Sequence, residues 1–388
     1  MFKTVFENFT LKGRSLLPVI QGGMGVGISA HRLAGTVAAL GGMGTISSVD
    51  QRRHHGDLME KIGKSRDKEL IDKANLVALD REIKKALDMS GGKGAIAVNV
   101  MRALNEYASY VRQACESGAN AVVVGAGLPL DLPDLTKDFA KVAIIPILSD
   151  VRSIALLLKR WMRKNRLPDA IVIENPKFAA GHLGIGSLDD IDKPQYESPN
   201  VVEGTLELFK ELKIENENIP LIVAGGIHTH EQMVKLMDLG ADGVQLGTAF
   251  AVTQEGDAHI NFKETLANAT PEDIVTLVST AGLPMRAVRT PWVERYMDKL
   301  DKLQSIAKPK DCTAAFDCLI KCGWRDGIQD WGQFCIDTQL AFALKGDVKR
   351  GLFFRSSEPL PFGNAIRPVK ELMEYLLTGV RPAELVAA

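Results

Sequence analysis

The sequence contains no long apolar run and carries almost no net charge. None of its hydrophobic segments approaches the roughly 18 consecutive apolar residues that a membrane-spanning helix needs. Charged side chains interrupt residues 1–16, so this stretch lacks the continuous apolar core of a signal peptide. With 47 Lys and Arg against 48 Asp and Glu, the net charge is −1, which implies no broad attraction to nucleic acid or anionic membrane. We therefore expect a cytoplasmic protein that binds neither.

Cysteine is scarce, and its spacing is not that of a metal site. One of the five cysteines, Cys115, lies in an amphipathic stretch and is expected to be buried. The other four, separated by six, four and thirteen positions, are Cys312, Cys318, Cys322 and Cys335. Zinc and iron–sulfur sites typically use cysteines paired across two residues, which this spacing lacks. Packed free thiols are the favoured interpretation, with a metal site and a disulfide or redox role as the alternatives.

Short apolar segments alternate with amphipathic ones along the first two thirds of the chain. The composition, 46% hydrophobic and 24% charged, is that of a soluble globular protein, and 35 glycines suit many tight turns. Eight nearly continuous Val, Ile and Ala runs are expected to be strands buried on both faces. They cover residues 18–21, 44–47, 95–99, 121–124, 142–148, 170–174, 221–224 and 243–246. Eight strands with helices between them favour an α/β fold of the (β/α)8 or TIM-barrel type over an open doubly wound sheet.

The barrel is expected to occupy residues 1–256, with a helical insertion at about 52–90 after the second strand. The alternation stops beyond it, so residues 257–388 are expected to form a helical and irregular extension packed on the barrel. No internal repeat and no low-complexity linker is present. His54 and His55 lie in a polar stretch beside two arginines and are expected to face solvent.

Glycine and polar residues follow several of the expected strands. Because the carboxyl ends of barrel strands meet at one mouth, these residues are expected to lie together. His182 follows the sixth strand, and its imidazole can take a proton from an acidic carbon or donate a hydrogen bond to a nitro or carbonyl oxygen. The next two strands end in small-residue turns whose backbone N–H groups can bind phosphate. These turns contain Gly225, Gly226, Gly247 and Thr248.

Six motifs, in order along the chain, resemble those of the nitronate monooxygenase family, long called 2-nitropropane dioxygenases. They are LPVIQGGMG (17–25), AVNVM (97–101), GAGLP (125–129), AGHLG (180–184), AGGI (224–227) and GVQLGT (243–248). The resemblance covers about residues 16–255 and continues more loosely to the end. Ala180 departs from it, since the family commonly has glycine there. Each glycine turn is a weak signal alone, but six in the right order are a strong one.

The resemblance implies an FMN-dependent barrel in which the flavin lies at the mouth. Backbone and side chain of residues 21–24 would lie against the flavin ring, while Asn99 and Glu174 would hydrogen-bond its ribityl chain or ring edge. Gln245 would reach the phosphate or the ring. The cofactor-binding residues so implied are Gln21, Gly22, Gly23, Met24, Asn99, Glu174, Gly181, Gly225, Gly226, Gln245, Leu246, Gly247 and Thr248, with His182 as the catalytic residue.

The activity implied is oxidation of alkyl nitronates or nitroalkanes by oxygen to a carbonyl compound and nitrite. The expected partners are this small substrate and oxygen, and a homodimer is left open. One alternative is an NAD(P)H-dependent flavin reductase of quinones or enoyl thioesters. The absence of a GxGxxG motif argues against a Rossmann-type nicotinamide site but not against transient docking on a flavin. The other is a phosphate-binding barrel without flavin, because a fold alone does not decide function.

Overall fold

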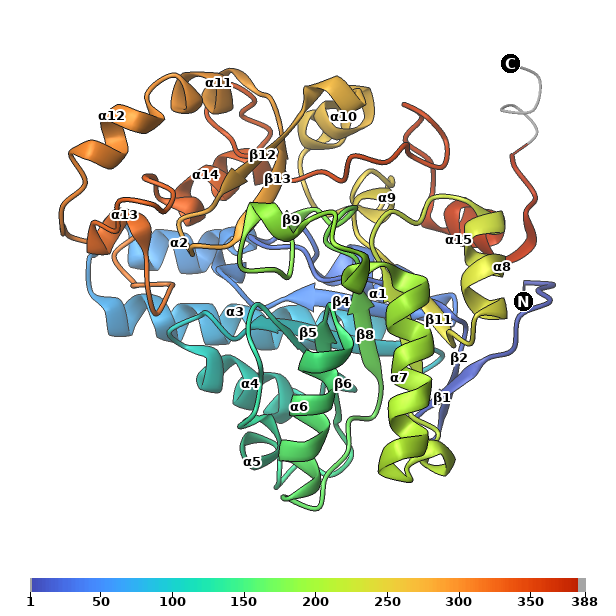
Figure 1. The fold of residues 1–388 in the computed structure, drawn as a ribbon. Coiled ribbons are helices and arrows are strands. Elements are labelled where there is room, and N and C mark those ends of the chain that lie inside the picture. The colour runs from blue at the N-terminus through green and yellow to red at the C-terminus, as the bar shows by residue number, and fades with distance from the viewer. Residues whose placement is uncertain (1, 383–388) are drawn as a thin grey trace.

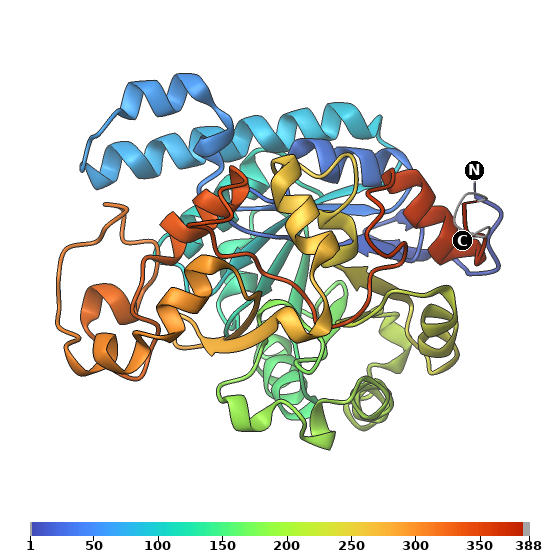
Figure 2. The ribbon, with the colours of Figure 1, turned by 90° about the horizontal axis from the view of Figure 1, so that it is seen from above.

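The computed structural model describes residues 2–382 and contains a closed, parallel, eight-stranded barrel (Figures 1 and 2). Its strands are β3 (Val19–Gln21), β4 (Met43–Ser47), β5 (Ala95–Met101), β6 (Ala121–Gly125), β7 (Ala143–Leu148), β8 (Ile171–Glu174), β10 (Leu221–Ala224) and β11 (Gly243–Leu246). Each strand pairs with the next of these, and β11 pairs with β3 to close the ring. The prediction of a (β/α)8 barrel is confirmed, with every expected strand present.

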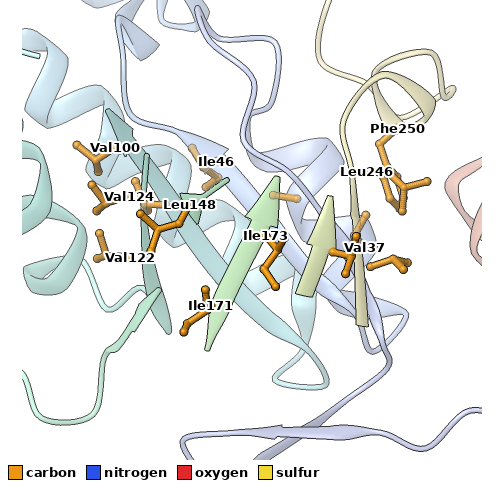
Figure 3. Close-up of a cluster of buried hydrophobic side chains, with 14 of the residues drawn as sticks. Val37, Ile46, Val100, Val122, Val124, Leu148, Ile171, Ile173, Leu246 and Phe250 are labelled. Atoms are coloured by element: carbon orange, nitrogen blue, oxygen red, sulfur yellow. The ribbon is translucent and has the colours of Figure 1, made fainter. Parts of the chain in front are cut away.

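Successive residues of a barrel strand point alternately into the barrel and toward the helices outside it. In β5, Ala95 and Ala97 belong to the cluster that fills the barrel, whereas Ile96 and Val98 belong to the larger cluster beneath the helices. Figure 3 shows part of this larger cluster. Both faces of the strand are therefore apolar, which explains why the strands appear in the sequence as unbroken hydrophobic runs.

A small antiparallel hairpin closes the amino-terminal end of the barrel. It is formed by β1 (Phe9–Leu11) and β2 (Arg14–Leu16), which pair antiparallel. Phe9, Leu11 and Leu16 are buried in the same cluster as the side chains inside the barrel. The hairpin fills the amino-terminal end, so the carboxyl ends of the strands are left as the place for a binding site.

Helices surround the barrel (Figure 2). They are α1 (His31–Ala39), α2 (Gly56–Ile62), α3 (Lys68–Ser90), α4 (Tyr107–Glu116), α5 (Leu132–Leu135), α6 (Val151–Met162), α7 (Ser198–Leu212), α8 (His230–Asp238), α9 (Thr248–Ala251), α10 (Ile260–Asn268), α11 (Pro291–Met297), α12 (Leu300–Ser305), α13 (Gly323–Asp326), α14 (Ile336–Leu344) and α15 (Val369–Thr378). The stretch expected to be a helical insertion contains α2 and α3, and α3 packs on α1. Near the end of the chain, α15 packs between α1 and α8 and completes the ring of helices. No helix within residues 2–382 is long and apolar enough to cross a membrane.

The segment after the barrel strands lies over the barrel mouth and contains more than helices and loops. Strands β12 (Ile274–Val278) and β13 (Pro284–Val288) form an antiparallel hairpin. Strand β13 also pairs with β9 (Gly181–His182), which comes from the loop after β8 (Figure 1). The extension, expected from the sequence to be helical and irregular, therefore also contains a β-hairpin. Together with β9 this hairpin forms a three-stranded sheet that holds the segment bearing His182.

Candidate active site

A cavity of about 510 Å³ lies at the carboxyl end of the barrel strands. The structure brings to its wall every predicted site residue except Gln21. The predicted residues that line it are Gly22, Gly23, Met24, Asn99, Glu174, Gly181, His182, Gly225, Gly226, Gln245, Leu246, Gly247 and Thr248. Residues from the loops and from the segment after β11 also line the cavity.

Gln21 is buried inside the protein and holds two barrel strands together. Its side-chain Oε1 accepts a hydrogen bond from the Thr45 N–H at 2.9 Å, and its Nε2 donates to the Thr45 carbonyl at 3.1 Å. Both the oxygen and the nitrogen of the side-chain amide thus form hydrogen bonds with the backbone of β4. The side chain has no accessible surface, so this glutamine stabilises the strand pairing rather than facing the cavity.

The turns after β10 and β11 offer unengaged backbone donors to the cavity. Gly225 and Gly226 have positive φ angles of 98° and 76°, which other residues rarely adopt. No hydrogen bond among the described residues uses the N–H groups of Gly225, Gly226 or Gly247. The N–H of Thr248 begins helix α9 and therefore has no partner within that helix. Four N–H groups on neighbouring turns match what a phosphate group requires.

The surroundings of Gly247 distinguish it from the two glycines after β10. A Cβ atom on Gly226 would meet Phe178 at 2.7 Å, and one on Gly225 would meet the Asn175 carbonyl at 2.8 Å. A Cβ on Gly247 would meet only the Met24 side chain, no nearer than 3.8 Å. Gly225 and Gly226 are required by the fold, whereas a side chain on Gly247 would enter the free space that a phosphate needs.

The turn after β3 packs closely on two polar side chains of the cavity. A Cβ on Gly22 would stand 3.2 Å from Cγ of Gln245, and one on Gly23 would overlap the side chain of Asn99. Glycine at these two positions lets the chain pass directly over Asn99 and Gln245. The backbone of the LPVIQGGMG motif thereby becomes part of the cavity wall.

Asn99 of β5 and Glu174 at the end of β8 line the cavity with polar side chains that have no protein partner. Neither side chain makes a hydrogen bond to any residue in the described part of the chain. Burial raises the pKa of the Glu174 carboxyl to about 7. Polar groups in a cavity without partners in the protein are suited to bind a polar ligand, such as a ribityl chain or the edge of a flavin ring.

His182 reaches the cavity from β9 and is held there by residues of the extension. Its Nε2 is 2.9 Å from Oγ of Ser279, at the end of β12, and its ring lies 6.2 Å from the ring of Phe354. Met285 of β13 pairs with His182 in the sheet. Burial lowers the pKa of the imidazole to about 4, so the ring is neutral at pH 7.

The contacts of Ser279 allow two hydrogen-bonding arrangements at His182. Oγ of Ser279 accepts a hydrogen bond from the Ala281 N–H at 3.2 Å. Because a hydroxyl oxygen has two lone pairs, Ser279 can either donate its own hydrogen to Nε2 of His182 or accept a second hydrogen bond from Nε2–H. When Ser279 donates, the proton of the neutral imidazole is on Nδ1, which has no partner among residues 2–382. In that tautomer His182 can donate a hydrogen bond to a ligand.

Several residues at or beside the cavity escaped sequence reasoning because they come from the extension. Ser279 positions His182, Phe354 packs against its ring, and Ser356 lines the cavity near Thr248. The Ser356 N–H donates to Oγ of Thr248 at 3.3 Å. These residues lie in segments with no strand–turn motif, so no local pattern marks them.

All five cysteines are free, and Cys318 lines the cavity.

Comparison of the sequence with known families gives one match across almost the whole chain. The model of the nitronate monooxygenase family matches residues 10–376. A probable nitronate monooxygenase of Staphylococcus saprophyticus is 29% identical over 133 residues, which are 34% of this chain and 36% of that protein. A probable nitronate monooxygenase of Staphylococcus aureus is 32% identical over 126 residues, or 32% and 33% of the two chains. The alignments thus span about a third of the length of these curated relatives.

Solved structures with similar folds include a nitroalkane oxidase and FabK. A nitroalkane oxidase from Streptomyces ansochromogenes has a TM-score of 0.62 at 18% identity, covering 96% of this chain and 97% of that one. FabK from Thermotoga maritima has a TM-score of 0.59 at 22% identity, covering 93% and 91%. At these identities the similarity shows the fold alone.

Proposed function

The chain belongs to the nitronate monooxygenase family of flavin-dependent oxidoreductases, and from that premise we propose that it uses FMN to oxidise alkyl nitronates with oxygen, yielding a carbonyl compound and nitrite. The observation that carries the proposal is the content of one cavity. It combines four backbone N–H groups suited to a phosphate with a buried imidazole that can donate a hydrogen bond. The first feature suits a mononucleotide cofactor, and the second suits a substrate with an anionic oxygen.

The residues of the cavity suit FMN rather than a dinucleotide. The phosphate would be held by the turns after β10 and β11, through Gly225, Gly226, Gly247 and Thr248. The chain has no GxGxxG motif for a second phosphate. Asn99, Glu174 and Gln245 would hydrogen-bond the ribityl chain and the ring, and Met24 with its neighbouring glycines would pack on the ring, as the resemblance implies. The flavin would supply the electron-transfer chemistry between the nitronate and oxygen.

The protein's own part in the reaction is to bind, orient and shield the nitronate. His182 would donate Nδ1–H to a nitronate oxygen, which would fix the anion in the cavity. Ser279 would support this tautomer by donating its own hydrogen to Nε2 of His182. The pKa of about 4 makes His182 a weak base in the free protein, so a nitronate that is already deprotonated is a better substrate for this site than the parent nitroalkane.

The proposal is tested on the purified protein in two steps. First, we expect a yellow protein that releases FMN, and not FAD, when it is denatured. Second, we expect oxygen uptake and nitrite release with ethylnitronate in the absence of NADH. A flavoprotein that consumes NADH with a quinone or an enoyl thioester and ignores nitronates would establish the reductase alternative. A colourless protein that cannot be reconstituted with FMN would leave only a barrel that binds phosphate without flavin.

A further inference from the structure

We infer that the nitronate accepted by this cavity carries an uncharged, apolar chain, and that residues of the extension select it. The inference rests on the proposed function and adds the class of substrate. It follows from two properties of the cavity wall, its charge and its composition beside His182.

The charged side chains around the cavity all have the same sign. Of the described residues that line it, none is lysine or arginine. Four of them are carboxylic acids: Asp150, Glu174, Asp337 and Glu358. A substrate with a second anionic group, such as a carboxylate, would therefore find no cation in the wall and would be repelled by any of these groups that is ionised.

The arginines beside cavity-lining residues are engaged elsewhere, among them Arg355, which donates to the backbone carbonyls of Leu266, Ser356 and Glu358. Arg53 forms an ion pair with Asp337 at 2.7 Å and another with Asp50, so its charge is compensated by two carboxylates. Arg286 of β13 donates to the backbone carbonyls of Pro176 and Ala179. None of these guanidinium groups lines the cavity. The backbone donors suited to a phosphate belong to the turns after β10 and β11, where the cofactor would use them.

Hydrocarbon side chains form the wall beside His182. Phe354 packs against the imidazole, and Leu352 lies two residues before it on the same extended segment. The carbonyl of Leu283 accepts a hydrogen bond from the N–H of Ser279, which places Leu283 next to the residue that holds His182. All three line the cavity.

The apolar wall continues from this point into helix α14. The Leu352 N–H donates to the carbonyl of Gln339, and the next residue of the helix, Leu340, lines the cavity. Leu104 and Leu319, joined by a β-bridge, add further hydrocarbon. A nitronate whose oxygens are held by His182 would thus have its alkyl chain among leucine and phenylalanine side chains, which favours burial of additional methylene groups.

The experiment measures kcat/KM of the FMN-loaded enzyme for nitronates of increasing length and different charge. Along the series from nitroethane to 1-nitrohexane we expect kcat/KM to rise about three- to fourfold for each added methylene. The decisive pair is 1-nitrobutane and 3-nitropropionate, which are similar in size but differ by one carboxylate. We expect the nitronate of 1-nitrobutane to be preferred at least about tenfold.

A charged variant tests whether the wall is responsible for the preference. Leu283 is only half-buried, so lysine can be accommodated there, and methionine at the same position is a control of similar volume. We expect Leu283→Lys to reduce the preference for 1-nitrobutane over 3-nitropropionate about tenfold and Leu283→Met to keep the wild-type ratio. Equal or better use of 3-nitropropionate by the wild-type enzyme would overturn the inference. Failure to oxidise any nitronate would instead refute the proposed function, so the two failures are distinguishable.

Discussion

Replacement of His182 by alanine distinguishes a hydrogen-bond donor from a catalytic base. A donor binds the nitronate itself, so its loss should slow the oxidation of a pre-formed nitronate and of the parent nitroalkane alike. A base acts only on the nitroalkane, so its loss should leave the pre-formed nitronate almost unaffected. The donor is favoured because burial lowers the pKa of His182 to about 4, which makes the imidazole a weak base.

The size of the effect follows from the contact that is removed. A hydrogen bond to a charged group contributes about 1.5–3 kcal/mol. At about 1.4 kcal/mol for each factor of ten, His182→Ala should lower kcat/KM for ethylnitronate about 10- to 150-fold. Loss of a general base would typically cost about 10²- to 10⁴-fold, and only with nitroethane.

The assay compares initial rates of oxygen uptake with ethylnitronate and with nitroethane for three proteins that all retain flavin. The third protein, His182→Gln, is the matched control, since its amide can still donate a hydrogen bond but cannot act as a base near neutral pH. We expect His182→Gln to recover part of the activity lost in His182→Ala. Unchanged turnover of ethylnitronate in His182→Ala, together with a large loss on nitroethane, would refute the donor role.

The barrel could be predicted from the sequence because its signals are local. Each buried strand is a short apolar run of its own, and in a parallel barrel the residues that follow the strands end at one mouth. For this reason residues as distant in sequence as Gly22 and Thr248 were expected together and do line one cavity. However, whether a polar side chain at the end of a strand reaches the cavity depends on the direction in which it points. Gln21 ends β3, yet its side chain is directed at the backbone of β4, and nothing in the adjacent sequence distinguishes it from Gln245, which lines the cavity.

Features that depend on distant partners could not be predicted. Strand β13 is defined by its pairing with β12 and with the short β9, and the latter contact joins Arg286 to Gly181, more than a hundred residues away. The expectation that His55 faces solvent was wrong for the same reason, and His54 is half-buried, with its Nε2 2.7 Å from the Gly27 carbonyl oxygen. His55 is buried, with its Nε2 3.0 Å from Oε1 of Glu82, a residue of α3 that a reading of the local sequence does not bring near it. Ser279, which holds His182, likewise becomes visible only once the chain is folded.

Two further substitutions test the cofactor end of the cavity. Gly247→Ala should fold normally, because φ at this position is −105° and the new methyl group meets only Met24, but it should bind FMN at least about tenfold more weakly. Gly56→Ala, which also introduces a methyl group into open space but outside the cavity, is the control, and equal FMN affinity in both variants would place the phosphate elsewhere. The second substitution, Glu174→Gln, addresses pH. Since the pKa of Glu174 is raised to about 7, this carboxyl is largely neutral below that pH and becomes anionic above it. The charge that appears as pH rises would repel an anionic nitronate, so kcat/KM for ethylnitronate should fall about tenfold between about pH 6 and 9, a loss that about 1.4 kcal/mol of repulsion produces. Glutamine is neutral throughout, so Glu174→Gln should show no such fall while retaining FMN. A pH profile that declines equally in the variant would assign the titration to another group of the holoenzyme.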